Sequence, residues 1–225
     1  MRTIVFDKLP STNDYAKKLK NLNEDVAIIA KRQTKGRGTK GRSFVSCDGG
    51  IYLTLVKLYP CLAKDSFSIM IGSALSVVKT LRAFGINAGI KWPNDILVNN
   101  KKICGILIEN VFEGESVKKA VIGIGLNVNN EISEEIKDIA ISCKQILNKE
   151  LSVDTLTATL IYNLYGENTF EEYRKHCLFI GEEVSITSQN RVYKAIIEDI
   201  LPNGNLLLKG GEVLSSAEVT IRKIS

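Results

Sequence analysis

The chain has 225 residues, with 30 Lys and Arg against 25 Asp and Glu and a formal net charge of +5. A chain of this length can form one domain, or one domain and a small addition, without disulfide or metal crosslinks. Its 44% hydrophobic and 24% charged residues are typical of globular proteins and exclude a disordered chain. The mild positive charge suits phosphates or an acidic partner and does not select between them.

Cysteine and histidine usage excludes several kinds of site. The five cysteines are widely spaced and never form C-x-x-C, so neither a disulfide framework nor a zinc ribbon is indicated and the thiols are expected to be reduced. His176 is the single histidine, which argues against Ser/His/Asp triads and favours a capping role at a helix end. Without a signal peptide or a spanning apolar run, we expect a cytoplasmic protein with no membrane contact.

The first two thirds of the chain predict a mixed, mainly antiparallel sheet flanked by helices, an α+β fold. Ser11 and Asp14 have capping-box spacing before a helix at 15–22. Asp65 is expected to be the N-cap of a long helix at 65–84. Turns between the apolar segments indicate antiparallel hairpins. The predicted strands are 3–9, 26–33, 51–58, 88–92, 96–98, 103–109 and 117–128.

The last third changes character near Leu178. Residues 133–177 are helical in composition, with Ser152 as an expected N-cap. Short alternating strands at 183–187, 192–200, 206–209 and 218–223 are separated by turn residues, which is typical of a small β-barrel. We therefore expect two domains, 1–177 and 178–225.

A basic, glycine-rich segment at 34–42 is predicted to be a flexible loop. Gly36 to Gly41 match G-x-G-x-x-G, but no helical pattern follows, so a Rossmann dinucleotide loop is excluded. The glycines follow rather than precede the Val-Ala-Ile-Ile-Ala-Lys strand, so a kinase loop is excluded as well. An anion-binding loop and a solvated basic loop remain as alternatives. Its basic residues are Lys35, Arg37, Lys40 and Arg42.

Two further clusters carry polar residues at strand junctions. Lys91-Trp92-Pro93-Asn94-Asp95 joins two apolar runs, and Lys102 begins an otherwise apolar strand where an anionic partner is expected. The alternative for the first cluster is a turn with a capping Asp. Gly123 and Gly125 share one strand face, which leaves room for a ligand on the sheet, although a bulge explains a single glycine equally well.

In their order and spacing, these clusters resemble the biotin-protein ligase family. The resemblance covers about residues 3 to 130 and rests on the early Ser-Thr-Asn at 11–13 and on the segments 36–42, 46–52, 91–95, 102–109 and 123–129. It implies the biotin/lipoate ligase fold, which is like that of class II aminoacyl-tRNA synthetases. The terminal β-module resembles the family's SH3-like domain more loosely.

The resemblance implies a biotin-[acetyl-CoA-carboxylase] ligase. Such an enzyme uses MgATP to convert biotin to biotinyl-5′-AMP and diphosphate, and then transfers biotin to a lysine of a biotin carboxyl carrier protein. Lys102 and Arg37 correspond to catalytic positions. Biotin contacts are implied for Ser11, Thr12, Asn13, Gln33, Gly36, Arg37, Gly38, Thr39, Lys102, Gly105, Leu107, Gly123 and Gly125. ATP and adenylate contacts are implied for Arg37, Thr39, Arg42, Phe44, Asn94, Asp95, Lys102 and Asn127. Mg²⁺ is expected to bind mainly through the ATP phosphates, with Asp95 as its protein contact, and no separate metal site is expected.

The sequence departs from the family pattern at two positions. Thr39 stands where the family usually has Arg, and Phe44 stands where Trp is common. The start of the motifs near residue 11 predicts that the family's N-terminal winged-helix DNA-binding domain is lacking, hence no DNA partner; a homodimer remains open. The alternatives are a lipoate or octanoate ligase and, in another class, a nucleic-acid-binding module. Tyr193 is the single aromatic residue after position 180, which disfavours the latter.

Overall fold

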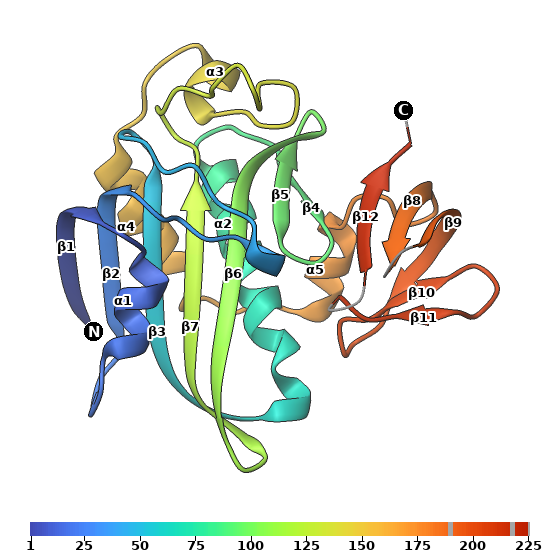
Figure 1. The fold of residues 1–225 in the computed structure, drawn as a ribbon, viewed down its shortest axis with the longest axis horizontal. Coiled ribbons are helices and arrows are strands. Elements are labelled where there is room, and N and C mark those ends of the chain that lie inside the picture. The colour runs from blue at the N-terminus through green and yellow to red at the C-terminus, as the bar shows by residue number, and fades with distance from the viewer. Residues whose placement is uncertain (189–190, 217–218, 225) are drawn as a thin grey trace.

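The computed structural model describes residues 1–188, 191–216 and 219–224, and its main element is a seven-stranded sheet (Figure 1). The first two strands in the sheet order are parallel and every other neighbouring pair is antiparallel. This confirms the predicted mixed, mainly antiparallel sheet. In spatial order the strands are β1 (Arg2–Leu9), β2 (Val26–Gln33), β3 (Ile51–Leu62), β7 (Ser116–Leu126), β6 (Lys101–Glu113), β5 (Asp95–Val98) and β4 (Gly89–Lys91).

The two faces of this sheet are covered unequally. Helix α2 (Phe67–Ala83) packs on one face together with α4 (Val153–Asn163) and α5 (Phe170–His176), and the main hydrophobic core lies there. On the other face the seven-residue helix α1 (Thr12–Lys18) buries Ala16 against β2, β3 and β7. Figure 1 shows that the segment after β2, with its short 3₁₀ turn η1 (Thr39–Gly41), crosses in front of this second face. A short helix and a loop thus leave room for a site.

A second, smaller antiparallel sheet follows α5. It docks on the first part through Trp92, whose Nε1–H donates to the Gly204 carbonyl at 2.8 Å, and through an ion pair between Arg174 and Asp199. The proposed boundary near Leu178 falls between α5 and β8, and Glu218 lies outside the described residues. The strands are β8 (Glu183–Ser188), β9 (Arg191–Ile200), β10 (Leu206–Leu208), β11 (Val213–Leu214) and β12 (Val219–Lys223).

The helix boundaries differ from those predicted. Asp65 is not the N-cap of α2, because residues 63–65 form the 3₁₀ turn η2 (Ala63–Asp65) and Ser66 takes the cap position. The first helix begins at Thr12 rather than at residue 15, directly after Ser11, whose Oγ accepts from the Asp14 N–H. The capping role of Ser152 is confirmed by its bond from the Thr155 N–H.

The helical prediction for 133–177 was too broad. Turns occupy 134–139, and the remainder is divided among α3 (Cys143–Leu147), α4 and α5. A capping box begins α3 at Ser142, and Asn148 in the left-handed conformation (φ 51°) ends it. His176 ends α5 as expected, with Nδ1 2.9 Å from the Glu172 carbonyl oxygen. None of the helices among the described residues is long and apolar enough to cross a membrane.

Candidate active site

Three glycines give the open face of the sheet a floor without side chains. Gly105 on β6 pairs with Gly125 on β7, and Gly123 lies two residues earlier on the same face as Gly125. A Cβ on Gly125 would lie 2.7 Å from the Phe44 ring, and one on Gly123 would collide with the Asn13 amide oxygen. Only glycine therefore lets an aromatic ring and an amide lie directly on the strands.

The start of α1 places three buried polar side chains beside this floor. Ser11 is the N-cap, and Thr12 and Asn13 form the first turn; all three are at most 5% exposed. The Thr12 N–H donates to Gln33 Oε1 at 2.8 Å, and Gln33 Nε2 donates to Ser46 Oγ at 3.0 Å. Buried polar groups need partners, and here the partners come from β2 and the segment that follows it.

Lys102 reaches the same floor because of a bulge in β6. Ile96 opposes Cys104 and Leu97 opposes Lys102, so Ile103 is an extra residue in the strand. Residues three apart in a regular strand lie on opposite faces, but the bulge places Lys102 on the face of Gly105. The Lys102 ammonium lies 2.9 Å from where a Cβ on Gly105 would be and 2.6 Å from Asp95 Oδ1.

Positive charge exceeds negative charge around Asp95. Lys91 Nζ lies 3.9 Å from Asp95 Oδ2, so two ammonium groups share one carboxylate. Burial lowers the pKa of Lys91, and the nearby charges of Lys102 and Arg42 lower it further, against the opposing effect of Asp95. An anion bound here would relieve the repulsion between these cations, which suits a polyphosphate.

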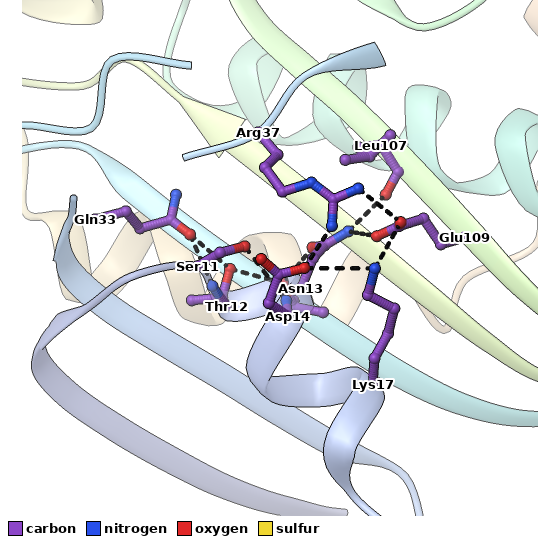
Figure 2. A network of polar contacts seen from close by, with 10 residues as sticks. Ser11, Thr12, Asn13, Asp14, Lys17, Gln33, Arg37, Leu107 and Glu109 are labelled. Carbon is purple, nitrogen blue, oxygen red and sulfur yellow. Dashed lines mark hydrogen bonds and ion pairs between the residues drawn. The ribbon is translucent and has the colours of Figure 1, made fainter. Parts of the chain in front are cut away.

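Arg37 lies across the site and is held by two carboxylates, as Figure 2 shows. One guanidinium nitrogen of Arg37 donates to Asp14, and the other, Nη2, donates to Glu109 Oε1 at 3.0 Å. Glu109 also accepts from Lys17 Nζ at 2.9 Å and from Asn13 Nδ2 at 3.1 Å. Burial alone would raise the pKa of Glu109, but these hydrogen bonds and the charge of Arg37 lower it below its ordinary value.

The structure brings most of the expected residues into one cavity. A neighbouring cavity is lined by Arg42 and Asp95 and extends to β12. It shares four lining residues with the first cavity: Thr39, Asn94, Ile106 and Leu107. The expected residues that line the first cavity are Ser11, Thr12, Asn13, Gln33, Arg37, Gly38, Thr39, Phe44, Asn94, Lys102, Gly105, Leu107, Gly123 and Gly125.

Two expected residues line neither of these cavities. Gly36 lies behind them, where a Cβ would contact Ser46 Oγ at 2.6 Å. The Asn127 amide is buried: Nδ2 donates to the Ile141 carbonyl at 3.2 Å and Oδ1 accepts from Asn130 at 3.1 Å. In this structure Asn127 therefore holds the segment after β7 and faces no open space.

Three polar residues of the site were not predicted as site residues. In the sequence, Asp14 has the pattern of a helix-cap residue and Glu109 has that of the end of an apolar strand, although a single charged residue that closes such a run is a usable signal. Thr54 is fully buried on β3, and its hydroxyl lies 2.7 Å from both Thr12 Oγ1 and Asn13 Oδ1. Its position within the apolar run 51–58 gave it the pattern of a core residue.

Comparison with known proteins assigns this architecture to a family. The model of the biotin/lipoate A/B protein ligase family matches residues 5–127, which include α1, the basic loop and the glycine floor. The chain belongs to this family. Among its relatives, the bifunctional ligase/repressor BirA of Bacillus subtilis is 35% identical over 180 residues, covering 77% of this chain and 55% of the relative. The chain thus spans about half the length of the first curated relatives it matches.

Other relatives in the family match over more of their length. The biotin-[acetyl-CoA-carboxylase] ligase of Mycobacterium tuberculosis is 32% identical over 206 residues, covering 84% of this chain and 74% of the relative. Among solved structures, the biotin protein ligase of Aquifex aeolicus in complex with biotin and ATP has 28% identity and a TM-score of 0.82, and each chain is 99% covered. The mixed sheet and the second β-sheet of this chain thus match those of a solved structure from the same family.

Proposed function

We propose that this family member is a biotin-protein ligase. In the first step, a biotin carboxylate oxygen attacks the α-phosphorus of ATP, and the bond to the bridging oxygen breaks to release diphosphate. In the second step, the side-chain amine of a carrier-protein lysine attacks the acyl carbon of biotinyl-5′-AMP. That step breaks the acyl–phosphate bond and releases AMP. The acceptor proposed is a biotin carboxyl carrier protein of a biotin-dependent carboxylase.

The polar end of the first cavity is the observation that favours biotin as the substrate. Ser11, Thr12 and Gln33 lie there; the first two are buried, Gln33 is half-buried, and all three can donate and accept hydrogen bonds. The cyclic urea of biotin offers one carbonyl acceptor and two N–H donors. Lipoyl and octanoyl chains offer neither at this end and would leave buried polar groups unpaired, at a cost of about 1–3 kcal/mol for each group. These three residues therefore favour biotin over lipoate or octanoate.

The cations beside the floor fit the activation step. Lys102 is the proposed catalytic residue: its ammonium would hold the biotin carboxylate near the α-phosphate and stabilise the charge that develops there. Arg42 and Lys91 border the neighbouring cavity, where the nucleotide phosphates would lie. Arg37 would turn from Asp14 and Glu109 toward the phosphates once these arrive, since a phosphate offers it a bidentate partner.

Mg²⁺ would enter this site with ATP. Among the described residues no group of three His, Cys, Asp or Glu side chains could hold a metal ion. Asp95 is a carboxylate with oxygen atoms suited to Mg²⁺, which usually combines one or two carboxylates with substrate phosphates. Its place beside Lys102 fits this role, and the metal would neutralise charge on the phosphates.

The remaining proposed contacts follow the shape of the site. Gly38 and Leu107 line the biotin cavity, Gly36 shapes the loop behind it, and Asn94 lies at the junction of the two cavities. The Phe44 ring covers Gly125 and offers an apolar surface for stacking. Asn127 would reach the nucleotide only after releasing the Ile141 carbonyl, so this proposed contact requires a local rearrangement.

A transfer assay tests the function. The protein is incubated with ATP, a carrier domain and radiolabelled biotin, and in parallel with radiolabelled octanoate or lipoate. We expect label on the carrier with biotin alone, dependent on ATP and lost when the acceptor lysine is replaced. Transfer of octanoate or lipoate in place of biotin would assign the chain to the other branch of the family.

A further inference from the structure

A hydrogen-bonded chain of four side chains runs behind the polar end of the cavity. Thr12 Oγ1 lies 2.7 Å from Thr54 Oγ1, Thr54 Oγ1 lies 2.7 Å from Asn13 Oδ1, and Asn13 Nδ2 lies 3.1 Å from Glu109 Oε2. Thr54 is fully buried, and neither Thr54 nor Glu109 lines the cavity. Thr54 can therefore affect a ligand only through Thr12 and Asn13, whereas Glu109 can act through Asn13 or through Arg37, which pairs with it and lines the cavity.

The Glu109 end of the chain sets the orientation of the Asn13 amide. A carboxylate can only accept, and so can the Leu107 carbonyl, which lies 3.4 Å from the same amide nitrogen. Lys17 and Arg37 pair with Glu109 and favour its ionised form. The Asn13 nitrogen must therefore face Glu109, and its oxygen must face Thr54.

The orientation of Asn13 in turn fixes both threonine protons. Asn13 Oδ1 can only accept, so the Thr54 hydroxyl donates its single proton to it. Two hydroxyl oxygens 2.7 Å apart need a hydrogen between them, and the proton of Thr54 is already used. Thr12 therefore donates to Thr54 at 2.7 Å rather than to its other acceptor, Gln33 Oε1, which lies farther away at 3.1 Å. Every proton in the chain points toward Glu109, and Thr12 is left with lone pairs alone for the cavity.

We propose that Thr54 and Glu109 are positioning residues for head-group specificity, because they force Thr12 to act as an acceptor and so require an N–H on the ligand. This inference rests on the proposed function. The neighbouring groups complete the pattern: Gln33 Oε1 is taken by the Thr12 N–H, while one Gln33 N–H and the Ser11 hydroxyl proton have no partner among the described residues. These two donors can bind the carbonyl oxygen of a cyclic urea, and the Thr12 oxygen can accept from one of its N–H groups.

Binding of biotin and of two close analogues tests this. In each analogue one of the two ureido N–H groups is replaced by oxygen, which gives a cyclic carbamate with an acceptor at that position. Dissociation constants are measured by calorimetry without ATP. For the wild type we expect one carbamate to bind about a hundredfold more weakly than biotin, because its oxygen faces a Thr12 lone pair.

The variants separate hydrogen-bond direction from packing. Thr54→Val removes the nearer acceptor for the Thr12 proton, and Glu109→Gln offers an N–H that allows Asn13 to turn. In both variants Thr12 can donate either to Gln33 Oε1, 3.1 Å away, or to an acceptor in the cavity. We expect each to bind biotin about tenfold more weakly and to lose most of its preference over that carbamate. Thr54→Ser keeps the hydroxyl and should retain the preference. Thr157→Val is the matched control, because its buried hydroxyl donates to its own helix.

A further control separates Glu109 from its ion pairs. Asp14→Asn removes the other carboxylate that holds Arg37 but leaves the chain intact, so its preference for biotin should equal that of the wild type. A Thr54→Val protein that keeps the full preference for biotin over the carbamate overturns the proposal. An Asp14→Asn protein that loses as much of this preference as Glu109→Gln also overturns it. If Thr54→Val does not fold, the comparison of Glu109→Gln with Asp14→Asn decides alone. Failure of the wild type to bind biotin overturns the proposed function instead.

Discussion

The ammonium of Lys102 lies 2.6 Å from Asp95 Oδ1, and this contact neutralises the cation that the proposed chemistry requires. A bound carboxylate and phosphate would compete with Asp95 for Lys102. Asp95 would then be available to Mg²⁺ or to Lys91, whose Nζ lies 3.9 Å away. In the proposed function, this ion pair would thus link the arrival of substrate to the release of Asp95 for Mg²⁺.

Replacing Lys102 should remove adenylate formation while the fold persists. Loss of a charged transition-state contact costs about 3–4 kcal/mol, or roughly a hundredfold or more in rate. Lys101→Ala is the control, since that neighbour binds the Lys137 carbonyl on the exposed side of the strand. The measurement is the rate of biotinyl-AMP formation from labelled ATP. A Lys102→Ala protein as fast as Lys101→Ala would show that Lys102 is not the catalytic cation.

The glycine floor should not tolerate a methyl group. In Gly125→Ala the new Cβ would lie 2.7 Å from the Phe44 ring and would push the ring into the cavity. We expect KM for biotin to rise about tenfold or more, which corresponds to 1–3 kcal/mol of steric strain. Gly72→Ala in α2 is the control, because its nearest neighbour would be 3.9 Å away; it should leave KM unchanged. Equal effects of the two changes would indicate a general loss of stability.

The basic loop should be cut by trypsin more slowly when ligand is bound. Arg37, Lys40 and Arg42 supply cleavage sites in a segment with little apolar burial. Biotin with ATP should slow cleavage severalfold, because the loop would close over them. Without ligand, the ion pairs of Arg37 already hold the loop, so Asp14→Asn should be cut faster than the wild type. Identical cleavage with and without ligand would exclude a lid.

The sequence predicted the sheet well because its strands follow simple alternation and its turns carry Gly and Asn. It also singled out Lys102, the glycines and the Ser-Thr-Asn segment at 11–13, since these residue types are unusual where they occur. It could not predict that Lys102 shares a face with Gly105, because a one-residue bulge reverses the face and leaves no local signal. The roles of Thr54 and Glu109 could not be predicted for a related reason, because they depend on hydrogen-bond partners more than 40 residues away in the sequence.

The ion pair of Arg174 with Asp199 should make docking of the second sheet sensitive to acid. The hydrogen bond from Arg174 lowers the pKa of Asp199 below its ordinary value, so the folded protein holds the ionised form more strongly than the unfolded chain does. This stabilisation is present above the unfolded pKa, about 3.9, and is lost as the pH falls through the lower folded value. Melting temperatures measured from pH 7 to 2.5 should fall more steeply for the wild type than for Asp199→Asn. Parallel curves would show that the pair contributes nothing.

Thr39 is the departure from the family pattern that should matter most for the intermediate. Thr39 lines both cavities, and its hydroxyl accepts from Arg42 at 3.2 Å. Lys40, the nearest replacement for the usual Arg, instead donates to the Val219 carbonyl on β12 at 2.8 Å, which directs its ammonium away from the floor. An ammonium also lacks the planar fork of a guanidinium. The adenylate is therefore expected to lack one charge-assisted contact, worth about 1.5–3 kcal/mol.

Thr39→Arg should restore that contact and lengthen the lifetime of bound biotinyl-5′-AMP roughly ten- to a hundredfold. Stray biotinylation of bystander proteins should fall in the absence of carrier, because less adenylate escapes. Thr39→Lys is the matched variant: it adds charge without the fork and should give a smaller gain. The lifetime is measured by a pulse-chase of labelled adenylate from the three proteins. An unchanged or shorter lifetime in Thr39→Arg would mean that Arg42 or the backbone amides of the loop already hold the phosphate.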